Sequence, residues 1–236
     1  MSSTGQLGLP LVQPAQAQKH VTVNHALQRL DGIVQMILQS QIVTTPPTAV
    51  TDGICYAVPV GAVNAWAGQA GKVAIGAGGG WDFAVPQRGW RALIRDEGAE
   101  AVFDGTGWIS GQVTLSPNAA GLALKVREAD FTVPAGAVAV TAALIPANAV
   151  VFGVTARVVA AITGTLASWE LGNPGAVGRF GSGLGLAQGS FARGVLGSPT
   201  AFYTPTALQL DATGGSFAGG AVRLAVHYLE LSLPQP

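Results

Sequence analysis

The feature that most constrains this chain is a narrow apolar seam near its start, followed by a sharp break. Five apolar residues recur at intervals of four, three, four and three: Val23, Leu27, Leu30, Val34 and Ile37. This heptad spacing is typical of a helix that packs against copies of itself. We therefore predict a helix from about Pro14 or Ala15 to Gln41, with the five residues as its oligomerisation surface. Pro46 and Pro47 exclude any continuation.

The residues around this helix add two expectations. Pro10 and Pro14 exclude regular helix before it, so residues 1–14 should form an extended arm. His20 and His25 are five residues apart on the helix and have only Asp31 as a nearby acidic residue. Metal ligands on a helix are normally spaced to share one face, so we expect no metal site.

The chain carries unusually little charge. Charged residues make up 10% of it, against about 25% in an ordinary soluble protein. Such a chain either exposes much Ala, Gly, Ser and Thr or buries surface in an oligomer, and we expect the oligomer. The seam alone fits a dimer, a trimer or a tetramer, and we predict a homotrimer.

The balance of charge excludes two classes of partner. Lys and Arg number 12, and Asp and Glu number 12, which gives a formal net charge of zero. We therefore expect no nucleic-acid partner, because the chain has no basic stripe. We also expect no membrane insertion and no signal peptide, because no long uninterrupted apolar run is present. We expect no cofactor, and the Gly run at 78–80 is not a phosphate loop, because neither a helix nor a Lys follows it.

The segment 46–110 has the pattern of a small Trp- and Gly-rich β-module. Four Trp residues lie close to Gly: Trp66, Trp81, Trp90 and Trp108. They could be platforms for sugar rings, but we favour the alternative that they form the core of a module with few other large side chains. Asp104-Gly105 between two short strands predicts a hairpin. Cys55, the one cysteine, lies in a strand-like run without basic neighbours, so we expect a buried, unreactive thiol.

The C-terminal segment 131–236 is predicted to be a β-sandwich of the jelly-roll kind, after a linker and first strand at 111–130. Short strands are separated here by Gly and Pro turns. In the last strand, Val222, Leu224, Val226 and Tyr228 face one way, and Leu229 and Leu231 lie on the other face. Apolar residues on both faces suit a strand between its own core and a neighbouring subunit. The fold class is thus mainly β, with the helical segment 1–45 at the N-terminus.

Two parts of the chain resemble known families. The run Pro-Ala-Gln-Ala-Gln-Lys-His-Val-Thr at 14–22, with residues 24, 26–27, 89–92, 96–99 and 103–108, resembles a domain family of formally unknown function. That family is common in alphaproteobacterial prophages and gene transfer agents, and the likeness covers roughly 6–110. Residues 145–158, 179–181 and 219–224 are similar to receptor-binding ends of phage-type fibres. The resemblance implies a head-spike or fibre protein that attaches a particle to capsular polysaccharide, without catalytic residues.

An enzyme would need chemistry that the sequence scarcely offers. Glycosidases use two placed carboxylates, and residues 130–236 contain four acids: Asp130, Glu170, Asp211 and Glu230. The run at 181–183 lacks the spacing of a nucleophile elbow beside His227, the one His of this half. We therefore expect no enzyme, and a polysaccharide-degrading tailspike is the least favoured alternative.

A binding protein needs aromatic faces and a few polar groups on connecting segments. We predict six carbohydrate-binding residues: Trp169, Glu170, Arg179, Phe180, Tyr203 and Asp211. For each aromatic residue, core packing is an equally good alternative. The expected function is host attachment by a trimeric fibre on the surface of a phage-like particle, where it also contacts another fibre or capsid protein. A spacer or decoration protein without a ligand is the competing class.

Overall fold

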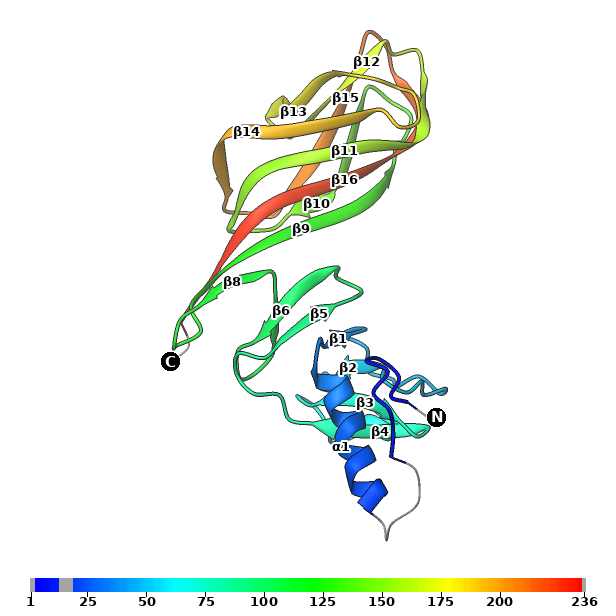
Figure 1. The fold of residues 1–236 in the computed structure, drawn as a ribbon. Helices are drawn as coiled ribbons and strands as arrows, with labels where there is room; N and C mark the ends of the chain where they lie inside the picture. The colour runs from blue at the N-terminus through cyan, green and yellow to red at the C-terminus, as the bar shows by residue number, and fades with distance from the viewer. Residues whose placement is uncertain (1–2, 13–18, 235–236) are drawn as a thin grey trace. The chain divides into compact units, whose positions relative to one another are not determined.

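The computed structural model describes residues 3–12 and 19–234, and the chain divides into two compact units, residues 1–112 and 113–236. Strands make up most of the second unit, whereas the first unit combines short strands with longer connecting segments and the helix near the N-terminus (Figure 1). The expectation of a mainly β chain with one N-terminal helix is confirmed. The expected start of the helix at Pro14 or Ala15 lies outside the described residues.

The first unit is one seven-stranded sheet with the helix α1. Its elements are α1 (Lys19–Ile33), β1 (Ile37–Leu38), β2 (Cys55–Ala57), a 3-10 turn (Asn64–Trp66), β3 (Val73–Ala77), β4 (Gly80–Ala84), β5 (Arg91–Ile94), β6 (Ala99–Phe103) and β7 (Trp108–Ser110). The strand order is β4-β3-β2-β1-β5-β6-β7, and β1 runs parallel to both β2 and β5. Since β1 joins the middle of this sheet, the segments expected at 1–45 and 46–110 form a single unit.

The helix ends earlier than the heptad spacing indicated. It stops at Ile33 rather than Gln41, and Gln35 adopts a left-handed backbone conformation with φ 53°. The turn allows Met36 and Leu38 to become buried in the sheet. Ile37 consequently lies in β1, and Val34 lies in the turn that follows the helix, so only three of the five predicted seam residues are on α1 itself.

Asp31, near the end of α1, holds the N-terminal arm. Its carboxylate is buried and accepts hydrogen bonds from the Thr4 hydroxyl (2.7 Å), the Gln6 backbone N–H (2.8 Å) and the Leu7 backbone N–H. The Gln6 side chain donates to the Asp31 and Val34 carbonyls, which the end of a helix leaves without partners. The arm therefore turns back on itself and is not simply extended.

Two of the four Trp residues of the first unit, Trp66 and Trp108, are buried in its core, as the favoured interpretation predicted. Trp66 is fully buried, and its ring centroid lies 5.1 Å from that of Tyr56 and 5.2 Å from that of Trp81. Trp108 is also buried, with its centroid 5.4 Å from that of Phe103. Burial leaves Trp66 and Trp108 little surface for binding a sugar, whereas Trp81 and Trp90 are only partly buried.

Two smaller predictions for this unit are confirmed. Cys55 is a buried free thiol, and burial followed by the negative charge of Asp31 raises its pKa to about 12. The Asp104-Gly105 turn joins β6 to β7, and the Asp104 carboxylate accepts the backbone N–H groups of Thr106 (2.7 Å) and Gly107 (2.8 Å).

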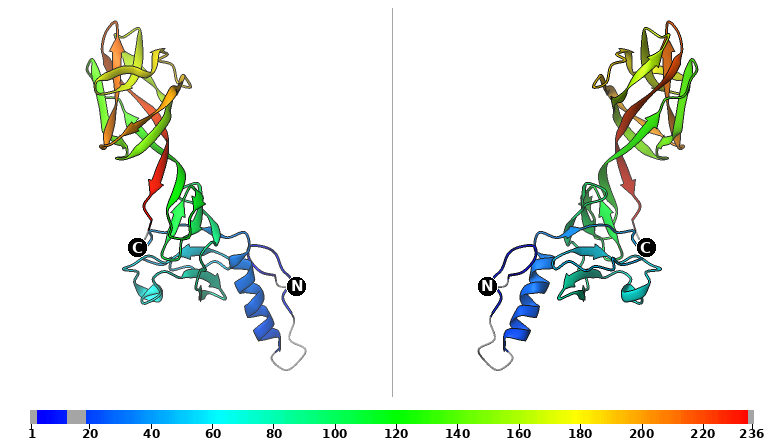
Figure 2. Two further views of the ribbon diagram at one scale, coloured as in Figure 1. Left: turned by 90° about the vertical axis from the view of Figure 1, so that its left-hand side faces the viewer. Right: turned by 90° about the vertical axis from the view of Figure 1, so that its right-hand side faces the viewer.

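The second unit consists of two antiparallel sheets packed face to face (Figure 2). Its strands are β8 (Gln112–Leu115), β9 (Gly121–Thr132), β10 (Val138–Ile145), β11 (Ala149–Gly164), β12 (Ser168–Asn173), β13 (Ala176–Leu184), β14 (Phe191–Phe202), β15 (Thr206–Thr213) and β16 (Phe217–Ser232). One sheet has the order β10-β15-β12-β13, and the other has the order β14-β11-β16-β9-β8. The segment 111–130, expected as a linker and first strand, contributes β8 and most of β9 to this unit.

The core of the second unit lies between the two sheets. The inward face of β16 is formed by Val222, Leu224, Val226 and Tyr228, as the alternation predicted. Leu208 and Leu210 of β15 meet them from the opposite sheet. Because successive residues of a strand face opposite sides, Arg223, Ala225 and His227 lie on the outer face of the five-stranded sheet.

Candidate functional site

The outer face of the five-stranded sheet carries a groove of about 370 Å³. It is lined by Glu128, Thr155, Ala156, Arg157, Phe191, Ala192, Arg193, Arg223 and Ala225. Residues paired across neighbouring strands share a face of the sheet. One such row is Phe191, Arg157, Arg223 and Asp130, and the next is Arg193, Thr155, Ala225 and Glu128. We call this feature the arginine groove.

Phe191 stands between two arginines at the β14 side of the groove. The Arg157 guanidinium lies 6.0 Å from the centroid of the Phe191 ring, and the Arg193 guanidinium lies 5.6 Å from it. The ring is 57% exposed, which is high for a residue of this size. Within the described part of the chain, neither Arg157 nor Arg193 forms a salt bridge. Their charges are therefore available to a ligand.

Arg223, at the other side of the groove, is already paired. Its Nε lies 2.7 Å from Asp130 Oδ1 and its Nη2 lies 2.8 Å from Asp130 Oδ2, and Glu128 is 3.7 Å away. The hydrogen bonds from Arg223 lower the pKa of Asp130. Both side chains are about half exposed, so this pair fixes the orientation of Arg223 more than it stabilises the fold.

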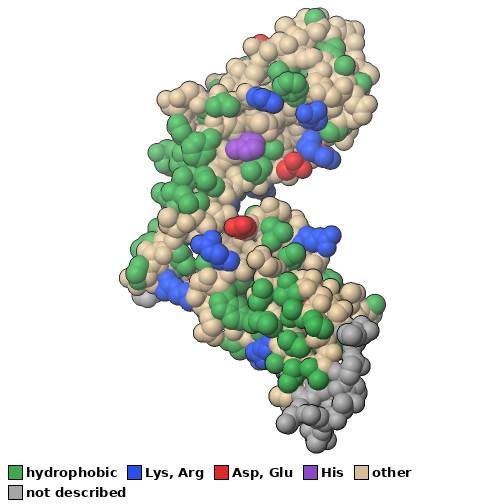
Figure 3. All heavy atoms as spheres, in the orientation of Figure 1, with side chains coloured by type: hydrophobic (Ala, Val, Ile, Leu, Met, Phe, Trp, Pro, Cys, Tyr) green, Lys and Arg blue, Asp and Glu red, His purple; other side chains and the backbone are tan. Residues whose placement is uncertain are grey.

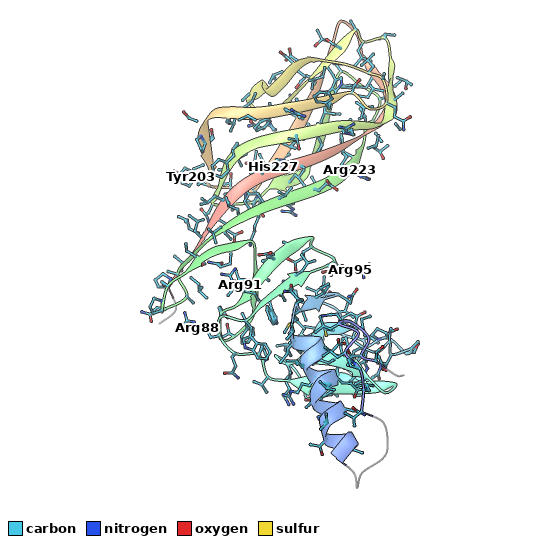
Figure 4. All side chains as sticks on the ribbon, viewed as in Figure 1. Arg88, Arg91, Arg95, Tyr203, Arg223 and His227 are labelled. Atoms are coloured by element: carbon cyan, nitrogen blue, oxygen red, sulfur yellow. The ribbon has the colours of Figure 1, made fainter. Side chains whose placement is uncertain are left out.

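His227 marks the boundary between the groove and an apolar patch on the same face. Figure 4 labels His227 and Arg223, which both belong to β16. The Nε2 atom of His227 lies 3.0 Å from the Thr155 hydroxyl. Further along β9 and β16, the patch is formed by Leu124, Val126, Leu229 and Leu231. Figure 3 shows green apolar side chains on one side of the purple His227, and charged side chains on its other side.

The helix of the first unit presents a second exposed apolar surface. Val23 and Leu30 are each 43% exposed and Val34 is 39% exposed, while Leu27 is partly buried. Four of the five predicted oligomerisation residues thus line one side of α1 and its C-terminal turn. Ile37, the fifth, is partly buried in β1.

Two of the six predicted carbohydrate-binding residues belong to the core. Trp169 is 1% exposed, and its indole N–H donates to the Gly185 carbonyl at 3.0 Å. Phe180 is 2% exposed. Neither ring has a face free for a sugar, so the prediction that Trp169 and Phe180 bind carbohydrate is wrong. Trp169 and Glu170 are adjacent in β12, and adjacent residues of a strand point to opposite sides of the sheet, so the two side chains do not share a site.

The other four predicted residues are accessible but do not line the arginine groove. Glu170 and Asp211 are cross-strand partners on β12 and β15, on the outer face of the four-stranded sheet. Arg179 is exposed and lies 5.7 Å from the centroid of the Phe202 ring. Tyr203 is 79% exposed in the connection from β14 to β15. The structure brings together only Glu170 and Asp211.

Sequence reasoning missed Arg157, Phe191 and Arg193, the residues at the cationic side of the groove. Phe191 and Arg193 alternate with buried Ala192, which indicates one exposed face of a strand. Their convergence on Arg157 depends on the register between β11 and β14, which the sequence does not reveal.

In the described parts of the chain, no helix has the length and apolar character needed to cross a membrane. A group of three or more His, Cys, Asp or Glu side chains placed to hold a metal ion is also absent from the described residues.

A protein-family model matches most of the first unit. Residues 23–109 match the family described as "Protein of unknown function (DUF2793)", a span that runs from α1 through most of β7. A search of curated proteins found no match. Among solved structures, the chain is similar to "Cyanophage Pam1 capsid asymmetric unit", with 23% identity and a TM-score of 0.31. That likeness covers 50% of this chain and 97% of the other.

Proposed function

We propose that this chain is a fibre or spike protein on the surface of a phage-like particle, of the kind found in gene transfer agents. Its second unit attaches the particle to capsular polysaccharide of the host cell. The observation that carries the proposal is the outer face of the five-stranded sheet, where a groove with two unpaired arginines and an exposed ring adjoins an apolar patch. The match of residues 23–109 to a family of unknown function agrees with the resemblance to prophage proteins in that region.

The strand order of the second unit supports a jelly roll. Strands β9, β16, β11 and β14 neighbour one another in one sheet, and β10, β15, β12 and β13 do so in the other. Apart from the β12–β13 hairpin, the chain passes to the opposite sheet at each step from β9 to β16. We interpret this order as the two Greek keys of a jelly roll, a fold used by capsid and lectin domains.

A homotrimer accounts for the apolar surface that one copy leaves uncovered. The exposed side of α1 and the apolar patch are two separate surfaces for contact with other copies, in a chain with only 10% charged residues. Size-exclusion chromatography with light scattering should give the mass of three chains. The Leu30→Gln, Val34→Gln double variant should shift the protein toward monomer. Val60→Gln, at a valine that is 89% exposed elsewhere in the first unit, serves as the control. A strict monomer at micromolar concentration would contradict the trimer.

Several weak sites on one oligomer bind a repetitive polymer far more tightly than one site does. The decisive test is therefore adsorption of the full-length protein to capsulated cells and to matched acapsular cells. We expect binding to capsulated cells only, and equal binding to both would contradict the proposal. Incubation with purified capsular polysaccharide should leave its chain length unchanged, because we propose an adhesin and not a depolymerase.

The competing function is a spacer or decoration protein that binds no ligand. It predicts that particles whose protein lacks residues 113–236 adsorb to cells as well as intact particles do. Under the proposal, those particles assemble but lose adsorption to capsulated cells.

A further inference from the structure

We propose that the arginine groove binds an acidic saccharide, with Arg157 and Arg193 holding a carboxylate of the sugar. The inference rests on the proposed function and names the chemical class of its ligand. The guanidinium groups of Arg157 and Arg193 both lie within 6.0 Å of the centroid of the Phe191 ring. Like charges gathered in this way, without a carboxylate partner among the described residues, favour an anion between or beside them.

The charge distribution selects a ligand with isolated negative charges. Three arginines, Arg157, Arg193 and Arg223, face two carboxylates, Glu128 and Asp130, so the local net charge is 3 − 2 = +1. The carboxylates lie on the β9 side and the unpaired arginines on the β11 and β14 side. A polymer with several sulfate or phosphate groups on each sugar would meet repulsion from Glu128 and Asp130. A polymer with a single carboxylate per sugar repeat would not.

The remaining groups suit the neutral part of a sugar. Phe191 offers an exposed apolar ring for the C–H face of a pyranose. The Thr155 hydroxyl, held 3.0 Å from His227, can donate to or accept from a sugar hydroxyl, and the Glu128 carboxylate can accept from one. Ala225 lies between Thr155 and Glu128, and its small side chain leaves room for the ligand. A volume of about 370 Å³ is at the small end of the range of about 300–1,000 Å³ for ligand sites, which fits a short segment of a chain.

The test uses polygalacturonate fragments of fixed length and the same fragments after methyl esterification. The two ligands share a backbone and differ only in the charge of the carboxyl group. Isothermal titration of the full-length protein should show that esterification weakens binding at least tenfold. The Arg157→Gln, Arg193→Gln double variant should lose at least tenfold in affinity for the acid form. Hyaluronate and polysialic acid, each compared with its carboxyl-reduced form, extend the test to other acidic sugars.

A matched control variant is Arg127→Gln. Arg127 is exposed on β9, next to Glu128 in sequence but on the opposite face of the sheet. The affinity of the Arg127→Gln variant for the acid form should therefore stay within twofold of the wild-type value. Circular dichroism and thermal unfolding verify that the double variant remains folded. If all three acidic polymers bind no better than their uncharged forms, or if the double variant binds as tightly as the wild type, the inference is overturned.

The failure of this inference can be told apart from the failure of the proposed function. If the wild type prefers capsulated cells and the double variant does so equally, the groove is not the site, while host attachment stands. If the wild type shows no preference for capsulated cells, attachment to capsule fails, and the titrations with purified polymers still decide whether the groove binds acidic sugars.

Discussion

Replacing Asp31 with Asn should release the N-terminal arm and destabilise the first unit. One carboxylate oxygen of Asp31 accepts the Thr4 hydroxyl and the Leu7 N–H, and the other accepts the Gln6 N–H. Asparagine keeps only one acceptor, so its NH₂ group would face the N–H of Gln6. A hydrogen bond to a charged group contributes about 1.5–3 kcal/mol, and a buried donor left unpaired costs about 1–3 kcal/mol. Because a detached arm regains water, we expect a net loss of roughly 2–4 kcal/mol.

Urea unfolding and hydrogen exchange measure this loss together. Four of the five Trp residues lie in the first unit, so Trp fluorescence reports mainly on its unfolding. The backbone amides of Gln6 and Leu7 should lose their protection from exchange in Asp31→Asn. Asp96→Asn, at an exposed aspartate of the same unit, should change stability by no more than about 0.5 kcal/mol. If Asp31→Asn matches this control in both measurements, the carboxylate does not hold the arm.

Three further changes test the packing. Gly32→Ala should destabilise the first unit despite a helix-propensity gain of about 1 kcal/mol, because the added Cβ would lie 2.6 Å from the buried Ile75 side chain; a raised urea midpoint would refute this. Gly194→Ala should cost the second unit about 1–3 kcal/mol, because its Cβ would lie 2.2 Å from a backbone oxygen of β13. Gly197→Ala, with nothing within 4 Å, should be nearly neutral in the same thermal melts. Burial raises the pKa of the Cys55 thiol above its value in the unfolded chain, so the neutral thiol should contribute fully to stability below pH 9, and this contribution should be lost between pH 9 and about 12. At pH 8, a thiol reagent should react with Cys55 only when urea has unfolded the first unit.

Periodicity in the sequence predicted the local structure of the second unit well. The alternation in β16 identified its buried and exposed faces. A strand with one face in the core and the other toward solvent alternates apolar and polar residues, and this period of two is visible in the sequence. The heptad spacing was a weaker guide. It continued through Ile37, whereas the chain leaves the helix after Ile33 to bury Met36 and Leu38 in the sheet. Tertiary burial overrode the local pattern at that point.

The candidate site was harder to predict, because it depends on the register between strands. Arg157, Arg193 and Arg223 come from three strands far apart in the sequence, and only their hydrogen-bonded pairing brings them to one face. The predicted binding residues included the neighbours Trp169 and Glu170 instead, and these two residues point to opposite sides of β12. A site built across strands is therefore hidden from reasoning along a single strand.

The pairing of β9 with β16 has a mechanical consequence. The two strands match in twelve consecutive pairs, from Gly121 with Ser232 to Thr132 with Ala221. The chain enters β9 from the first unit at the Gly121 end, whereas the arginine groove lies toward the other end. A particle that holds the first unit while the groove holds a cell would therefore pull β9 lengthwise along β16. Such a load is shared by all the hydrogen bonds of the pair at once and does not open them one after another, so this unit should resist tension along the attachment axis.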